Sequence, residues 1–236
     1  MKYTLYNRLG SGGFVVEAMF ALADIGFDYE PIQSKPSRPL GASIDHLNAW
    51  GQLPVLVLPD GRKMTEVAAI IAYLAQVEER CRMGPHLWVD DLAAFLRWSV
   101  FLSVNVYEAV LRRIYSDRYF VGLGEVVAEG VDMPGIDFGA TMTASIRKSG
   151  RNHAHKALRH IESEIAAERF LLGSRLSPCD LYLAMLYAWH NRQPDLPKCA
   201  EITARVATHA IVNPIWQRNF GDRLDEKWHE GGPLWQ

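Results

Sequence analysis

The sequence predicts a small mixed α/β domain followed by a larger domain made only of helices. Strand signals are confined to the first 65 or so residues, where they combine with two helical patterns in the order βαβ, loop, ββα. From about residue 88 onward, apolar residues recur at helical spacing and strand-like alternation is absent. A chain of 236 residues is long enough to build a core for each of two such domains.

The first βαβ unit is indicated by a change of hydrophobic period. Lys2–Leu9 alternates polar and apolar residues, which is typical of a strand, and a glycine-rich turn follows it. Apolar residues then recur at helical spacing over Phe14–Ile25, and Gly26 is the expected C′ residue of that helix. Phe27–Gln33 is expected to be a second strand, at a sheet edge because Pro31 cannot donate a ladder hydrogen bond.

A hairpin and a helix complete the first domain. Residues 34–50 are irregular and rich in proline. Pro54–Leu58 and Arg62–Met64 flank a Pro-Asp-Gly turn, which predicts a β-hairpin. Thr65 is expected to cap a helix that runs to about Glu79. The expected result is a four-stranded mixed sheet with helices packed on it.

The remainder of the chain is expected to be all-α. Trp88–Tyr115 has the pattern of one long helix, and residues 121–140, with five glycines and a proline, are typical of a loop insertion. Further helices are predicted at about 153–169, 178–190, 199–208 and 213–220. We therefore expect a first domain over residues 1–80, a linker over 81–87 and a helical domain over 88–236.

Composition excludes several classes of function. The 25 basic and 27 acidic residues are spread along the chain, for a net charge of −2, which disfavours a nucleic-acid-binding surface. Cys81, Cys179 and Cys199 form no C-x-x-C motif, so reduced thiols are expected. The amino terminus lacks the apolar run of a signal peptide, and we see no apolar stretch of about 18 residues. A cytoplasmic protein without a membrane partner is the expectation.

Four segments in order carry a resemblance to a known family. They are Leu47–Pro54 (LNAWGQLP), residues 55–75 (VLVLPDGRKMTEVAAIIAYLA), the pair FLLG at 170–173 and SPCDLYLA at 177–184, and His209–Phe220. Together they resemble bacterial glutathione transferases. The resemblance implies a thioredoxin-like N-terminal domain, an all-helical C-terminal domain and a homodimer. It also implies glutathione as co-substrate, a small electrophile as second substrate, and no metal.

The resemblance assigns glutathione-binding roles to two short segments. Leu53-Pro54 matches the family's cis-proline; if the bond is cis, the Leu53 backbone can pair with the cysteinyl part of glutathione like an added strand. Gln52 resembles the family's polar contact beside it. Thr65, Glu66 and Val67 open a helix whose free amides suit the γ-glutamyl carboxylate, with Glu66 on the ammonium. Most members have Ser in place of Val67.

The catalytic group is expected at the turn before the first helix. A transferase must hold glutathione as thiolate, and lowering a thiol pKa by roughly two units needs about 2.7 kcal/mol. A helix N-terminus and one hydrogen bond to the charged sulfur together supply that amount. Ser11 is the candidate donor. The family's Ser or Cys position, however, aligns with Gly12 to Phe14.

Several alternatives stay open from the sequence. Ser11 alternatively only caps the helix, Tyr6 at the end of the first strand is another candidate, and the backbone amides of the turn can hold an anion unaided. Ser177-Pro178-Cys179-Asp180 is interpreted as a structural capping box. The electrophile pocket is expected between the domains, where Trp98, Tyr107 and Tyr115 are possible walls. A non-catalytic glutathione transferase-like protein for binding or protein interaction is the alternative function.

Overall fold

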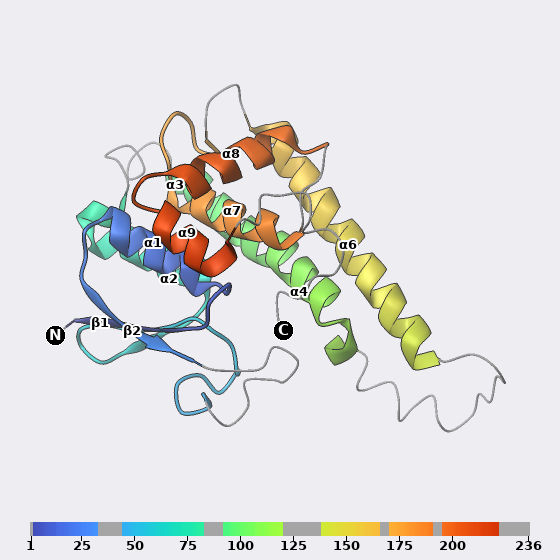
Figure 1. Ribbon diagram of the computed structural model, residues 1–236, viewed down its shortest axis with the longest axis horizontal. Helices are drawn as coiled ribbons and strands as arrows, with labels where there is room; N and C mark the ends of the chain where they lie inside the picture. Colours follow the sequence, from blue (N-terminus) through green and yellow to red (C-terminus); the bar gives the residue numbers. More distant parts are fainter. Residues whose placement is uncertain are drawn as a thin grey trace.

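The structure, a computed structural model, describes residues 2–32, 44–82, 92–119, 138–165, 170–190 and 195–221. The elements of the first part are β1 (Tyr3–Asn7), α1 (Gly13–Leu22), β2 (Phe27–Pro31), β3 (Val55–Val57), β4 (Lys63–Met64), α2 (Val67–Val77) and a 3-10 turn, η2 (Glu79–Arg82). Those of the second part are α3 (Leu92–Phe101), η4 (Leu102–Tyr107), α4 (Glu108–Ile114), η5 (Ser116–Tyr119), α6 (Phe138–Glu164), α7 (Pro178–His190), α8 (Pro197–Thr208) and α9 (Asn213–Phe220). Figure 1 shows the sheet at one end of the molecule and α6 along the other.

The N-terminal part contains the predicted four-stranded mixed sheet. Its strand order is β2-β1-β3-β4, with β1 and β2 parallel and the other pairs antiparallel. The edge position of β2 agrees with Pro31 at its end. Helices α1 and α2 lie on the same side of the sheet, between the strands and the second domain (Figure 1). Leu5 and Leu56 of the sheet are fully buried in the same core as Phe14 of α1.

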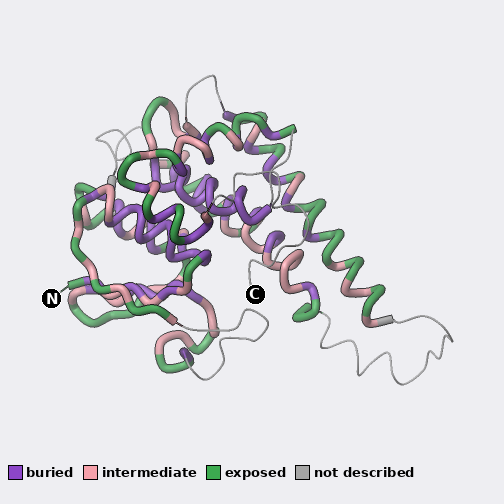
Figure 2. Tube along the Cα trace, in the orientation of Figure 1, coloured by how far each residue is buried: buried purple, intermediate pink, exposed green. Residues whose placement is uncertain are grey.

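The C-terminal part is helical in all of its described residues except a short bridge and the connecting turns. Helix α7 runs through its centre, and all 13 of its residues are buried, as Figure 2 shows. The bounds of α7 are the predicted ones, and those of α8 and α9 agree within two residues. The predicted fold class, a thioredoxin-like domain followed by an all-α domain, is therefore confirmed.

The end of α1 corrects one prediction. Gly26 is not the C′ residue, because the helix stops three residues earlier than expected. Asp24 has a positive φ of 51°, its N–H donates to the Ala21 carbonyl, and the Ile25 N–H donates to the Phe20 carbonyl. This is a Schellman motif built on an aspartate, one of the few non-glycine residues that tolerate the left-handed conformation.

The predicted long helix at 88–115 is interrupted by a π-helical turn. Residues 88–91 lie outside the described residues. Within the rest, η4 inserts one extra residue, so the Glu108 N–H donates to the Ser103 carbonyl five residues back. Leu102, the first residue of this turn, is fully buried, whereas Leu96 on α3 is 40% exposed.

Helix α6 begins at Phe138, earlier than the predicted start at 153. The first turns were missed because Gly150 and a run of polar residues weaken the apolar pattern there. A Cβ at Gly150 would lie 2.7 Å from both the Ala109 carbonyl oxygen and the Arg113 nitrogen. The glycine lets the backbones of α4 and α6 approach closely. The predicted insertion at 121–140 lies outside the described residues except for its last three, which are helical.

The structure leaves the exact domain boundary as a prediction. The sheet domain's last helix ends at Val77 and the helical domain's first begins at Leu92. Most of the expected linker at 81–87 lies outside the described residues.

The capping box before α7 is structural, as the sequence predicted. The carboxylate of Asp180 accepts the Leu171 N–H at 2.7 Å, the Ser177 N–H at 2.8 Å and the Ser177 hydroxyl at 2.5 Å. Burial raises the pKa of Asp180 to about 6 despite these donors. The fully buried carboxylate therefore fixes both the start of α7 and the turn at Leu171.

Replacing Asp180 by alanine leaves two buried N–H groups without an acceptor. We expect Asp180→Ala to lower the free energy of unfolding by roughly 3–5 kcal/mol. Ser177→Ala removes one hydroxyl and is expected to lower it by about 1 kcal/mol. Urea unfolding at mildly alkaline pH measures both values. Equal losses for the two variants would contradict this role of the carboxylate.

Candidate functional site

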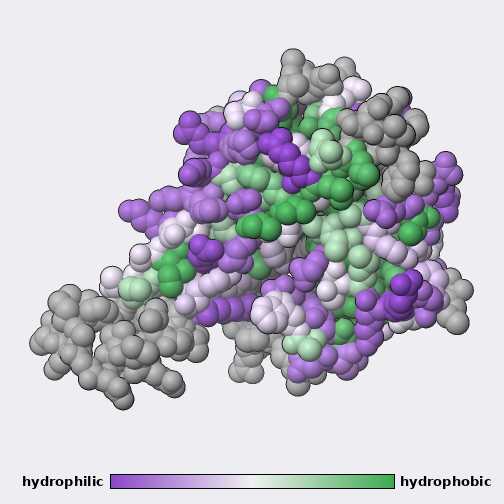
Figure 3. All heavy atoms as spheres, turned by 180° about the vertical axis from the view of Figure 1, so that it is seen from behind, coloured by the Kyte–Doolittle hydropathy of each residue, from purple (hydrophilic) through white to green (hydrophobic). Residues whose placement is uncertain are grey.

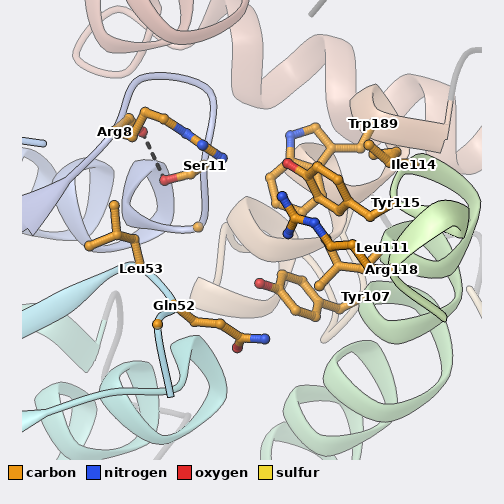
Figure 4. Close-up of a pocket in the computed structure, with 12 residues that line it drawn as sticks. Arg8, Ser11, Gln52, Leu53, Tyr107, Leu111, Ile114, Tyr115, Arg118 and Trp189 are labelled. Carbon is orange, nitrogen blue, oxygen red and sulfur yellow. Dashed lines mark hydrogen bonds between the residues drawn. The ribbon is translucent and has the colours of Figure 1, made fainter. Parts of the chain in front are cut away.

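Two adjoining cavities lie at the junction of the two domains. The smaller, of about 300 Å³ including its open mouth, is lined by all six residues predicted to bind glutathione: Gln52, Leu53, Pro54, Thr65, Glu66 and Val67. The larger, of about 630 Å³ including its open mouth, has Ser11 and Gly12 on one wall and residues of η4 and α4 on the other (Figure 4). Gln52, Leu53 and Tyr107 line both cavities, so the two lie next to each other.

Ser11 lies where the sequence predicted, between β1 and α1, and it lines the larger cavity. Its hydroxyl donates to Asn7 Oδ1 at 2.5 Å and to the Arg8 carbonyl at 2.8 Å (Figure 4 draws the second bond). Because a hydroxyl has one hydrogen, Ser11 can donate to a bound sulfur only by rotating away from these acceptors. In this structure the Ser11 hydroxyl stabilises the turn between β1 and α1 through its contacts with Asn7 and Arg8.

Glycines occupy the family's Ser or Cys position because side chains do not fit there. A Cβ on Gly12 would lie 2.7 Å from Val67 Cγ2 and 3.0 Å from Pro54 Cδ. A Cβ on Gly13 would lie 2.1 Å from the Asn7 side chain. Phe14 is fully buried against Trp216 and Phe220. Ser11 is therefore the hydroxyl nearest the start of α1 in this turn.

The Leu53–Pro54 peptide bond is cis, as the resemblance implied. The loop before it is shaped by Asn48, whose amide donates to the Gln52 carbonyl at 2.9 Å and accepts the Trp50 N–H at 3.0 Å. Asn48 also lines the smaller cavity. The sequence motif contained Asn48, but no role was predicted for it.

Helix α2 starts one residue later than predicted, with Glu66 rather than Thr65 as its N-cap. Glu66 has a φ of +65° and a ψ of 111°, a conformation that L-residues rarely adopt and that carries a strain on the order of 1–3 kcal/mol. Glu66 and Val67 both line the smaller cavity, so the first turn of α2 faces it. An anionic group bound there would meet the positive end of the helix dipole.

The opposite wall comes from the π-helical turn and α4. Figure 4 shows Tyr107, Leu111 and Tyr115 reaching toward Ser11 and Gln52. Burial raises the pKa of Tyr107, and the charge of Glu66 raises it further, so its hydroxyl stays protonated. Two of the three aromatic walls considered from the sequence thus line the cavity. Trp98, the third, is 4% exposed and belongs to the core.

The helical domain holds the first turn in position through Gly10. Trp189 Nε1 donates to the Gly10 carbonyl at 3.0 Å, and the Gly10 N–H donates to Asn219 Oδ1 at 2.9 Å. Asn219 also contacts the buried Glu17, which forms an ion pair with Arg218. Both polar backbone groups of one turn residue are therefore bound by residues about 180 or 210 positions away.

Tyr6, an alternative thiolate partner, is placed elsewhere. It packs beside Ile44, Leu53 and Val55 in a small apolar cluster and is absent from the described lining of both cavities.

Sequence reasoning missed other lining residues, namely Arg8, Ser103, Arg118, Tyr182 and Trp189. Of these residues, only Arg8 could have been identified from the sequence pattern, because it is a charged residue at the carboxyl end of a predicted strand. Tyr182 and Trp189 were hidden in an apolar helix.

Comparison with known proteins agrees with this geometry. Residues 15–77 match the family model described as glutathione S-transferase, N-terminal domain. The chain therefore contains an N-terminal domain of the glutathione S-transferase type. The uncharacterized GST-like protein YncG of Escherichia coli K12 is 27% identical over 193 residues, covering 78% of this chain and 80% of YncG.

Solved structures of bacterial glutathione transferases share the fold over nearly the whole chain. A glutathione transferase homologue from Sulfitobacter with bound glutathione has a TM-score of 0.75 at 16% identity, covering 93% of this chain and 99% of its own. A glutathione S-transferase from Methylobacillus flagellatus with glutathione bound has a TM-score of 0.68 at 17% identity, covering 91% and 98%. At these identities the likeness establishes the fold, and function has to be inferred from the site.

The close packing at Gly12 predicts the effect of a single methyl group. Gly12→Ala is expected to lower the free energy of unfolding by about 1–3 kcal/mol, because the methyl separates α1 from Pro54 and Val67. Thermal unfolding measures this loss.

Two further variants control this experiment. Gly26→Ala should be nearly neutral, because its Cβ would lie 3.6 Å from its nearest neighbour, the flexible Lys2 side chain. Adding Val67→Ala to Gly12→Ala removes the clashing methyl and should recover part of the loss. A Gly12→Ala protein as stable as the Gly26→Ala control would contradict the close packing.

Proposed function

We propose that this chain is a glutathione transferase in which enzyme-bound glutathione thiolate attacks a small electrophile. The observation that carries the proposal is the cavity lined by all six predicted glutathione residues, which adjoins a second cavity beside Ser11. A substrate in the first cavity can thus extend its sulfur into the second. Glutathione is bound in solved structures of the same fold, which supports the same ligand here.

In this proposal glutathione lies along three backbone segments. Its γ-glutamyl carboxylate meets the first N–H groups of α2, and Glu66 binds the ammonium. The Leu53 backbone pairs with the cysteinyl residue, and Gln52 adds a polar contact beside it. Val67 lacks the hydroxyl of most family members, but its N–H is available to the carboxylate at the start of the helix. The sulfur then points to the turn before α1.

Two groups at this turn favour the thiolate. The N-terminus of α1 contributes about 0.3–1 kcal/mol, up to about 2 when partly buried. A hydrogen bond from Ser11 to the charged sulfur contributes about 1.5–3 kcal/mol, less what is lost at Asn7. In the reaction the sulfur bonds to the electrophilic carbon, the leaving group departs with its electron pair, and the thiol proton passes to water.

The alternative is a glutathione-binding protein without turnover. The inward hydrogen bonds of Ser11 and the missing hydroxyl at Val67 favour it. Glutathione binding without turnover of any electrophile in a broad panel would support this alternative.

Separate variants distinguish binding of the tripeptide from activation of its sulfur. Ser11→Ala is expected to lower kcat/KM about tenfold and to raise the pKa of bound glutathione by about one unit. Glu66→Gln is expected to raise the KM for glutathione about tenfold and leave that thiol pKa unchanged. Ultraviolet absorbance of the thiolate against pH, with steady-state rates, measures all three quantities.

Each result has a defined reading. If the Ser11→Ala protein retains both the wild-type rate and the wild-type thiol pKa, the backbone amides of the turn hold the thiolate unaided. If calorimetry detects no glutathione binding to the wild type, the proposed function is wrong.

We also propose a cytoplasmic homodimer. Leu96, Val100 and Val104 form an apolar stripe spaced four residues apart, and they are 40%, 57% and 61% exposed. Figure 3 shows a hydrophobic area on the back face of the molecule.

The run Leu92–Ile114 is long and apolar enough to cross a membrane by composition, but its other side packs into the core. Three buried free thiols suit a reducing compartment.

A charge in the middle of this stripe is expected to separate the subunits. Val100→Glu should convert the dimer to a monomer in size-exclusion chromatography with light scattering, because an interface does not accommodate an unpaired buried carboxylate. Ala144→Glu adds the same charge to an exposed position on α6 and should leave the dimer intact. If both variants keep the wild-type mass, the stripe is not the interface.

A further inference from the structure

The larger cavity carries positive charge on both of its walls. Arg8 lines it from the turn after β1, and Arg118 lines it from η5, beyond the end of α4. Figure 4 shows both guanidinium groups directed into the space between the walls. Among the described residues that line this cavity, none is Asp or Glu. Two guanidinium groups that line one cavity from facing walls make that cavity attractive to an anion.

The surroundings of the two arginines are suited to a planar anion. The Arg118 guanidinium stacks on the Tyr115 ring, 3.9 Å from its centroid, which orients the plane of its donors. Arg8 and Tyr107 line the cavity from opposite walls. Arginine presents its donors in a fixed fork that matches the two oxygens of a carboxylate.

The rest of the cavity is flat and largely apolar. Tyr107, Tyr115 and Trp189 are aromatic, and Leu111 and Ile114 add aliphatic surface. Trp189 is only 4% exposed and is fixed by its hydrogen bond to Gly10. Such walls suit an aromatic or conjugated body, with the carboxylate at the end near the arginines.

We propose that the second substrate is an electrophile with a flat apolar body and a carboxylate, which Arg8 and Arg118 bind in the larger cavity. This inference rests on the proposed function, since it assumes that glutathione occupies the smaller cavity. With a halomethyl benzoate, the glutathione sulfur bonds to the benzylic carbon, the carbon–halogen bond breaks, and the halide leaves with the electron pair. The carboxylate takes no part in bond making and serves to bind and orient.

Binding of glutathione conjugates tests the inference without requiring turnover. Calorimetry compares S-methylglutathione, S-(4-carboxybenzyl)glutathione and the methyl ester of the latter's benzoate group. The carboxylate conjugate is expected to bind wild type about tenfold more tightly than the ester. Arg8→Met should remove most of this tenfold preference. Arg118→Met should reduce the preference by about threefold, because Arg118 is the more exposed of the two arginines.

The controls separate the arginines' role from general effects. Both methionine variants retain an unbranched apolar stem and should bind S-methylglutathione as wild type does, which also shows that they are folded. Arg159→Met removes the same charge from an exposed position on α6 and should keep the full preference for the carboxylate.

Three results would overturn the inference. Equal binding of acid and ester, with S-methylglutathione still bound, would reject the carboxylate subsite and leave the glutathione site intact. Loss of S-methylglutathione binding in either arginine variant would assign that arginine to the tripeptide instead. Absence of binding by all three ligands would reject the proposed function and this inference with it.

Discussion

The site depends on the contact at which three backbone segments meet around Gly12. At this residue the start of α1 packs against the cis-proline loop and the first turn of α2. The packing leaves no space for a Cβ on Gly12, because Val67 and Pro54 lie too close. This contact brings the amides of two helix N-termini to neighbouring cavities. Positive ends of two helices would repel in isolation, so buried apolar packing holds them together and an anionic ligand is favoured.

The helical domain completes this arrangement instead of merely covering it. Through Trp189 and Asn219 it binds both backbone groups of Gly10, two residues before Gly12. It also supplies Ser103, Tyr107 and Tyr182 to the smaller cavity. Neither domain alone forms the site, so the stability of the turn and the geometry of the cavities are coupled across the interface.

The fold was largely predictable because strand and helix signals are local. Period, turn residues and capping boxes lie within a few positions of what they specify, as Ser177 and Asp180 illustrate. The six glutathione residues were identified through motif resemblance, and the structure collects them around one cavity, although their roles stay predictions. Arg118 and Trp189 could not be found, because their position in the cavity depends on the phase of a helix and on packing between domains.

The two wrong helix bounds, the end of α1 and the start of α6, also depend on contacts that a local sequence pattern does not show. Asp24 ends α1 because hydrogen bonds of the helix end outweigh the preference for glycine. The early turns of α6 form because Gly150 allows tight packing on α4, a tertiary gain that outweighs weak local propensity. In each case a contact between distant or capping groups overrides the local signal.

The π-helical turn at Leu102–Tyr107 sets how the wall of the larger cavity responds to a change in chain length. Each residue advances an α-helix by about 100° around its axis, so the single extra residue sets the rotational phase of everything after it. Loss of one residue from that turn would swing Leu111, Ile114 and Tyr115 away from the opening together and bring a different helix surface to it. Deletion of one residue therefore exchanges the whole α4 wall of the larger cavity, while the smaller cavity keeps its residues from the cis-proline loop and α2.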